Sequence, residues 1–414
     1  MAVGQAQGEL VPANRTSRIV IVGAGIAGLA CALACARAGA KVEVLEAQAV
    51  VRDVPAHLDI VPNLLRDFAR LGLAEECVRR GFAYHGIAVV DEDGRHGFDI
   101  PTPRLAEPHL PCAVGIAYSE MLTLLRTHAR AAGAVIHAGR HADAVDAAAG
   151  RVHAADGGVF DADLVVLAAG ANSPLAAKVF GAAWRKAGSQ SWWHALLPRP
   201  TGLDRSTWMA GAPGHRLVLV PVDMTRAGVA VVRTSAVDAQ PGGATLRDTL
   251  ASWGELPRRL ARLMMPDTPT TIRPANLTFL EPPWFRGAVL CVGACANALP
   301  PNFGQSAAQA VEDAIVLGEL LAARLDRATR SSGSWRVAAN ARDASTSCSS
   351  ARRAGPPNPN RRRTCRRFRA SSVRSSAPPP DQKTLERNPT HEDHRTRCPG
   401  VWRRRRRRLL AISR

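Results

Sequence analysis

The first patterned stretch of the chain switches between two hydrophobic periods. Ile19–Val22 is a short β-branched run, and a glycine-rich turn follows at Gly23–Gly28. Apolar residues then recur at helical spacing in Leu29–Ala38, and Lys41–Glu46 is again strand-like after Gly39. This order predicts a strand, a helix and a second strand, which together form one βαβ unit of a parallel sheet.

The pattern predicts further elements before residue 170. Helices are expected where apolar residues recur every three to four positions, and strands where they alternate or run together. The predicted elements are an amphipathic helix at Val61–Leu73, a hairpin at residues 87–100 that turns at Asp93-Gly94, a helix at Ser119–Ala132, strands at Ala134–His137 and Arg151–Ala154, and a buried parallel strand at Asp163–Ala169.

A change of pattern marks a second domain. Between residues 184 and 274, strand-like pieces are separated by Pro, Gly and Asp, which is typical of an antiparallel sheet. A buried strand returns at Gly287–Val292, and a long helix follows at Gly304–Leu325. We therefore predict an α/β fold in which a Rossmann-like domain, residues 18–183 and 275–326, is interleaved with a mostly antiparallel sheet domain at residues 184–274.

The net charge comes from the C-terminal part of the chain. The 414 residues carry 54 Lys and Arg against 35 Asp and Glu, of which 24 basic and 5 acidic residues lie from Arg327 to Arg414. That excess of 19 basic residues accounts for the whole net charge of +19, so the formal charges of the other 326 residues sum to zero. The neutral body has no electrostatic reason to bind nucleic acid or an anionic membrane.

The two ends of the chain lack either period. Residues 1–17 are expected to be a flexible leader, and residues 327–414, rich in Arg, Ser and Pro, a disordered basic tail. Another interpretation of the tail is an arm that holds phosphates, and a third is a shifted reading frame that begins near codons 325–335. Translating the two other frames tests the frameshift, which is rejected if neither continues the amphipathic helix.

The cysteines indicate a reducing compartment. None of the nine forms a CxxC pair, and no signal peptide precedes them. Three glycines interrupt the apolar stretch Ile19–Ala36, so no membrane span is expected there. We expect a cytoplasmic protein whose thiols act as small hydrophobic side chains.

The glycine turn carries the first candidate chemistry. Gly23 permits the tight turn, Gly25 lets a diphosphate approach the backbone, and Gly28 lets the helix pack on the strand. Free N–H groups at the helix start favour phosphates, and Glu46 can accept both ribose hydroxyls of an adenosine. FAD or NAD is the expected occupant, and the alternative is a tight turn that binds no ligand.

A late segment distinguishes these cofactors. Residues 286–322, RGAVLCVGACANALPPNFGQSAAQAVEDAIVLGELLA, resemble the second flavin motif of the aromatic hydroxylase type of flavoprotein monooxygenase (group A), with its Pro-rich loop, GQ pair and ED pair. The family's arginine, PN and LGL are matched by Arg52, Pro62-Asn63 and Leu71–Leu73, and its third motif by Gly170 and Ser173. The resemblance covers roughly residues 18–325.

The resemblance implies an FAD-dependent monooxygenase that hydroxylates a small aromatic or conjugated substrate with NADH or NADPH and O2. It implies no metal and no nucleic-acid partner, and it leaves the catalytic residues and the oligomeric state open. The rigid turn before Gln305 would place a helix start beside the pyrimidine side of the flavin. The expected cofactor-binding residues are Gly23, Ala24, Gly25, Ala27, Gly28, Glu46, Arg52, Gly170, Gly293, Ala294, Pro301, Gly304 and Gln305.

Several positions depart from the family's pattern. Ala294 replaces the aspartate that binds the ribityl chain, Asn297 replaces a histidine, and Ala169 replaces an aspartate. Tyr118 stands where an arginine begins a helix near the flavin, and Pro55 and His57 replace two glycines. Each lost hydrogen bond costs about 0.5–1.5 kcal/mol of binding free energy. These changes therefore weaken the expected binding of FAD, but FAD remains the predicted cofactor.

The inserted sheet offers candidates for a substrate pocket. Trp192, Trp193, His194 and Trp208 lie in it, and neighbouring residues of one strand point to opposite faces, so at most one of the Trp pair faces a pocket. His194 is a candidate base for phenol deprotonation, but a surface or hydrogen-bonded histidine is the commoner role. His57 is a second candidate, because the resemblance places it beside the flavin.

Three alternatives stay open. They are a catalytically impaired flavin-binding homologue, a flavin oxidase or dehydrogenase that does not oxygenate its substrate, and a nucleic-acid binder that acts through the tail. No HExxH motif, Ser-His-Asp arrangement or metal cluster supports a hydrolase.

Overall fold

A computed structural model describes residues 16–50, 53–181, 184–186, 190–210, 216–234, 243–274, 277–299 and 304–328. The expectations for residues 1–15 of the leader and for the tail beyond residue 328 lie outside the described residues, as do Arg52 and Pro301.

A six-stranded sheet organises the Rossmann-like part. Its central strand β1 (Arg18–Val22) pairs in parallel with β2 (Lys41–Glu46) and with β12 (Leu164–Leu167). The parallel strands β8 (Val135–Ala138) and β21 (Val289–Cys291) extend it, and β20 (Phe285–Arg286) closes one edge. Strand β21 follows the strands of the second sheet in sequence but pairs with β12 of this sheet, which confirms the predicted interleaving of the chain.

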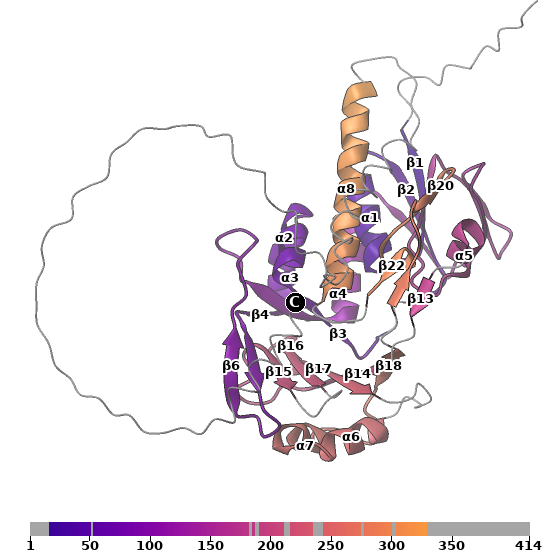
Figure 1. The fold of residues 1–414 in the computed structure, drawn as a ribbon. Coiled ribbons are helices and arrows are strands. Elements are labelled where there is room, and N and C mark those ends of the chain that lie inside the picture. Colours follow the sequence, from indigo (N-terminus) through magenta and orange to yellow (C-terminus); the bar gives the residue numbers. More distant parts are fainter. Residues whose placement is uncertain are drawn as a thin grey trace, which may run out of the picture. The chain divides into compact units, whose positions relative to one another are not determined.

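Long helices cover one face of this sheet (Figure 1). Helix α1 (Ile26–Arg37) follows the glycine turn, and α8 (Gln305–Ala328) and α4 (Tyr118–Ala131) pack with it in one hydrophobic core. A Cβ atom at Gly318 would stand 3.0 Å from the Cβ of Ala34, so α1 and α8 approach closely. The first and last helices of the domain therefore lie side by side.

Smaller elements pack against the other face. They form one core with side chains of β1, β12 and β21, among them Val20, Val165 and Val289. These elements are α5 (Pro174–Phe180), the strands β9 (Ala142–Asp146), β10 (Arg151–Ala154) and β11 (Val159–Asp161), and β19 (Leu277–Phe279), which pairs with β13 (Trp184–Lys186) and β22 (Asn297–Ala298).

A seven-stranded sheet forms the second part. Its order is β18 (Thr271–Pro274), β14 (Gln190–Pro198), β17 (Arg226–Thr234), β16 (Arg216–Pro221), β15 (Ser206–Ala210), β5 (Ile87–Val90) and β6 (His96–Ile100). The hairpin predicted at residues 87–100 forms, but β5 pairs in parallel with β15. The predicted first domain, residues 18–183, includes this hairpin, whereas its pairing with β15 places it in the second sheet.

Two helices that the sequence pattern did not reveal, α6 (Gly243–Ala251) and α7 (Glu255–Arg262), cover one face of this sheet (Figure 1). Trp193, Leu217 and Val231 pack beneath them in one core. The opposite face carries Trp192, Ala230 and Val232. Adjacent Trp192 and Trp193 therefore point to opposite faces, as predicted.

A small sheet connects the two large ones. Strand β7 (Ala113–Ala117) pairs with β3 (His57–Ile60) on one side and with β4 (Phe82–Tyr84) on the other. A Cβ atom at Gly115 would lie 2.1 Å from the carbonyl oxygen of Pro221, so β7 rests directly on β16. The helix predicted at Val61–Leu73 is α2 (Pro62–Arg70), and α3 (Ala74–Arg80) follows it.

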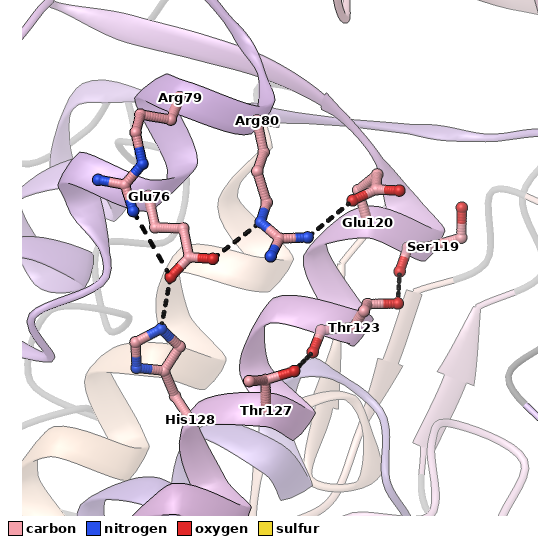
Figure 2. Close-up of polar contacts among 8 residues, drawn as sticks. All are labelled: Glu76, Arg79, Arg80, Ser119, Glu120, Thr123, Thr127 and His128. Atoms are coloured by element: carbon pink, nitrogen blue, oxygen red, sulfur yellow. Dashed lines mark hydrogen bonds and ion pairs between the residues drawn. The ribbon is translucent and has the colours of Figure 1, made fainter.

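Polar contacts hold α3 against α4 (Figure 2). The Glu76 carboxylate bonds the Arg80 Nε at 2.8 Å and the His128 Nε2 at 2.7 Å, and these partners hold the pKa of Glu76 below its usual value. Arg80 also reaches Glu120 in the first turn of α4. The network therefore anchors the helix that begins at Tyr118.

None of the helices that the structure describes is long and apolar enough to cross a membrane. The cysteines within the described ranges, Cys31, Cys35, Cys77, Cys112, Cys291 and Cys295, are buried free thiols. Within those ranges no group of three or more metal-ligating side chains occurs.

Candidate active site

The glycine turn is packed tightly on one side and open on the other. Gly23 has φ +104°, and a Cβ atom at Gly28 would lie 1.9 Å from the Gly23 carbonyl oxygen. At Gly25 a Cβ atom would meet none of the described residues within 4 Å, apart from its chain neighbours. Gly23 and Gly28 therefore let α1 pack against β1, whereas Gly25 leaves space in front of the helix start, which has no acidic residue in its first turn.

Glu46 stands beside this turn, at the end of β2. One carboxylate oxygen accepts the backbone N–H of Ala24 at 2.7 Å and the other that of Gln48 at 2.8 Å. Each oxygen keeps a further lone pair for a ligand hydroxyl. This hydrogen bond brings together Ala24 and Glu46, which are both predicted site residues.

Arg126 on α4 was not predicted from the sequence. Its Nε is buried and has no hydrogen-bond partner among the residues that the structure describes. Burial and the neighbouring Arg130 lower its pKa, and the charge of Glu46 opposes that shift. Only the packing of α4 against α1 brings this guanidinium within electrostatic reach of Glu46, so no local sequence signal could have identified it.

The late motif lies against the glycine turn. Gly293 has φ +58°, and a Cβ atom there would stand 2.7 Å from the Cβ of Ala27. Its N–H donates to the Asp313 carboxylate on α8 at 3.2 Å. Ala294 follows in the short 3-10 turn Gly293–Cys295. Residues 266 positions apart, Ala27 and Gly293, thus meet at one site.

The start of α8 meets the start of α2. Asn63 Nδ2 donates to Gln305 Oε1 at 3.0 Å, which joins two residues of the family's pattern. Gly304 has φ +65°, and a Cβ there would lie 3.1 Å from the carbonyl oxygen of Asp59 on β3. The predicted residues Arg52 and Pro301 flank this region in the chain but lie outside the described residues.

The third motif sits at the end of β12. Gly170 has φ +84°, and apart from its chain neighbours no atom in the part of the chain that the structure describes lies within 4 Å of the position of a Cβ. The Ser173 hydroxyl caps α5 by accepting the Ala176 N–H at 3.3 Å. Ala169 is exposed, and Asn297 Nδ2 donates to Gln309 on α8 at 3.2 Å. The side chains of Ala169 and Ala294 offer no hydrogen bond to a ligand at these two family positions.

Two histidines meet where β3 faces the seven-stranded sheet. The rings of His57 and His194 lie edge to face with centroids 5.9 Å apart, and Trp192 stacks on His194 at 6.0 Å. His194 is only 9% exposed. His194 therefore does not lie at the surface, and its Nδ1 has no hydrogen-bond partner among the described residues.

Burial keeps both imidazoles neutral. Desolvation lowers the pKa of His57 to about 4. Desolvation, followed by the charges of His57 and Arg273, lowers the pKa of His194 to about 3. At neutral pH each ring is thus a hydrogen-bonding group rather than a cation.

Comparison with known proteins decides the family. A family model described as an FAD binding domain matches residues 16–333. The chain is a member of this FAD-binding flavoprotein family. The resemblance to the group A flavoprotein monooxygenases is confirmed, and the α/β architecture of this flavoprotein agrees with that of its relatives.

Relatives of the flavoprotein carry names of oxygenating enzymes. It is 28% identical over 319 residues to an FAD-dependent urate hydroxylase of Klebsiella oxytoca, covering 73% of this chain and 81% of the relative. It is 27% identical over 319 residues to 2-heptyl-3-hydroxy-4(1H)-quinolone synthase of Pseudomonas aeruginosa, covering 73% and 80%. A Klebsiella pneumoniae protein, HpxO, crystallised with FAD and uric acid, shares the fold with a TM-score of 0.68 and 22% identity over 81% of this chain and 85% of that one.

The residues of the flavoprotein fit FAD. The open position at Gly25, the anchored Glu46 carboxylate and the close approach of Gly293 to Ala27 all lie around the one glycine turn, where a dinucleotide would bind. In the first turn of α8, as in that of α1, no acidic residue opposes an anion.

Proposed function

We propose that this protein is an FAD-dependent monooxygenase that uses NADH or NADPH and O2 to hydroxylate a small aromatic or heteroaromatic molecule. The observation that carries the proposal is the meeting of Gly293 with Ala27, since it joins the two flavin motifs into one site. Relatives named as urate hydroxylase and quinolone synthase support the substrate class.

In this proposal, Gly23, Gly25, Gly28 and the start of α1 hold the diphosphate, and Glu46 holds the adenosine ribose. The start of α8 at Gly304-Gln305 would hold the flavin ring, and Gly293-Ala294 and Gly170 would hold the ribityl chain. When bound, FAD supplies hydride acceptance from the nicotinamide and reaction with O2.

The protein's own contribution is to position the substrate and to exclude water. The small sheet seals one edge of the junction, because β7 rests on β16 without an intervening side chain at Gly115. Trp192, Ala230 and Val232, which are buried together on the face of the sheet toward the junction, would lie against the substrate's ring. The buried free thiols favour the cytoplasm as the place of action.

Reconstitution with FAD tests the proposal directly. We expect the purified protein to bind FAD and to consume oxygen when NADH or NADPH and an aromatic hydroxylation substrate are added. Oxygen uptake without substrate hydroxylation would identify an oxidase. Failure to bind FAD at micromolar concentration would instead identify an impaired homologue, which Ala294, Ala169 and Tyr118 would explain.

A further inference from the structure

Three buried nitrogen atoms gather at the junction of the small sheet and the seven-stranded sheet. They are Nδ1 of His57, Nδ1 of His194 and Nε1 of Trp192, and none has a hydrogen-bond partner within the described part of the chain. An unpaired buried polar atom destabilises the fold, because it has lost its hydrogen bonds to water and gained none in return. Three in adjacent rings therefore indicate a place built for a polar ligand rather than a tolerated defect.

The backbone register explains why these three rings meet. Trp192 and His194 are two residues apart on β14 and so share a face, opposite Val232 and Ala230 of β17. Gly228 lies two residues before Ala230 on β17, and a Cβ atom there would lie 2.2 Å from the His57 ring. The missing side chain at Gly228 leaves the notch that lets His57 reach His194.

The surroundings select against a cationic ligand. The guanidinium of Arg216 lies 5.5 Å from the centre of the Trp192 ring, and that of Arg273 lies 5.9 Å from the centre of the Tyr118 ring. Asp59, on the same face of β3 as His57, is bonded to Tyr84, and burial raises its pKa to about 6. At neutral pH Asp59 is mostly ionised, so two neutral imidazoles, two guanidinium groups and this carboxylate together suit a neutral ring.

The donor inventory narrows the ligand further. Trp192 Nε1 only donates, so the ligand needs an acceptor facing it. A neutral imidazole Nδ1 accepts or donates according to its tautomer, so it can take a ring N–H or O–H. A lactam, with N–H beside C=O on one edge of a flat ring, satisfies both requirements.

Resting on the proposed function, we infer that His57, His194 and Trp192 form a clamp that recognises the lactam or enol edge of a heteroaromatic substrate. Trp192 Nε1 donates a hydrogen bond to the lactam oxygen, and the histidine pair accepts one from the adjacent N–H or O–H. Gly228 is the positioning residue that admits His57 to the clamp.

Calorimetric titration with two matched probes tests the clamp without requiring turnover. The probes are 2-quinolone and N-methyl-2-quinolone, which differ by the ring N–H. We expect the native protein to bind 2-quinolone about tenfold more tightly, as one hydrogen bond allows. H194L should abolish that preference, and His194→Asn, which keeps a polar atom near the Nδ1 position, should restore part of it.

Trp192→Phe tests the donor, with Trp193→Phe as its matched control. We expect W192F to weaken 2-quinolone binding about tenfold. W193F should not change it, because Trp193 faces the opposite core and donates to Ser191 Oγ at 3.1 Å. Gly228→Ala displaces the His57 ring. It should reduce the preference for 2-quinolone over N-methyl-2-quinolone and leave the hydrogen bond from Trp192 intact.

Equal affinity of the native protein for the two probes, or an unchanged preference in H194L, would overturn the clamp. Equal effects of W192F and W193F would do the same. Probe discrimination without NAD(P)H-dependent oxygen consumption would leave the clamp standing and refute the monooxygenase. Oxygen consumption without discrimination between the probes would support the monooxygenase and refute the clamp.

Discussion

At the residue scale, the glycines of the first turn divide into two kinds. A methyl group at Gly28 would strike the Gly23 carbonyl oxygen at 1.9 Å, whereas one at Gly25 would enter open space. We therefore expect Gly28→Ala to lower the free energy of unfolding by about 1–3 kcal/mol, the usual cost of overpacking. Gly25→Ala should leave stability nearly unchanged but weaken FAD binding at least tenfold, because the methyl occupies the approach of the diphosphate. Thermal unfolding and flavin fluorescence titration separate the two effects, and equal stability losses in both variants would contradict this division.

At the element scale, we expect the stability of the small sheet to depend on pH. Tyr84 on β4 bonds the Asp59 carboxyl on β3, and burial raises the pKa of Asp59 to about 6 from 3.8. The unfolded chain releases this proton at lower pH than the folded protein, so the contribution of Asp59 to stability falls as pH rises from about 4 to 6. Asp59→Asn, which still accepts the Tyr84 hydroxyl, should be more stable than the native protein at about pH 8 and nearly equal to it at about pH 4. Melting temperatures at both pH values check this, and a less stable variant at the higher pH would refute it.

At the scale of the whole molecule, the basic tail and the flavin-binding body are expected to act independently. The family model matches residues 16–333, and the net charge of +19 comes from residues 327–414. A chain that ends at Gly333 should bind FAD within about twofold of the full chain and lose the binding of a short DNA duplex. Fluorescence anisotropy of the duplex at low and high salt, beside an FAD titration, measures both. DNA binding retained by the shortened chain would place a basic surface in the body.

The outcome at His57 and His194 shows where sequence reasoning stops. His57 was singled out only through the resemblance, and His194 was expected at the surface or in a hydrogen bond. Their contact depends on Gly228, which lies in a third strand, and on the pairing of β3 with β7. Such an arrangement has no local signature, because each contributing strand is compatible with many partners.

The sequence by itself determined the βαβ unit, the glycine turn and the late helix, because helical and strand periods and the stereochemistry of glycine are local properties of the chain. Only the tertiary structure decided that the hairpin at residues 87–100 pairs with β15, that Arg126 approaches Glu46, and that three unpaired nitrogens share one junction. These features arise from contacts between residues far apart in the chain, and such contacts exist only after the two sheets have packed together.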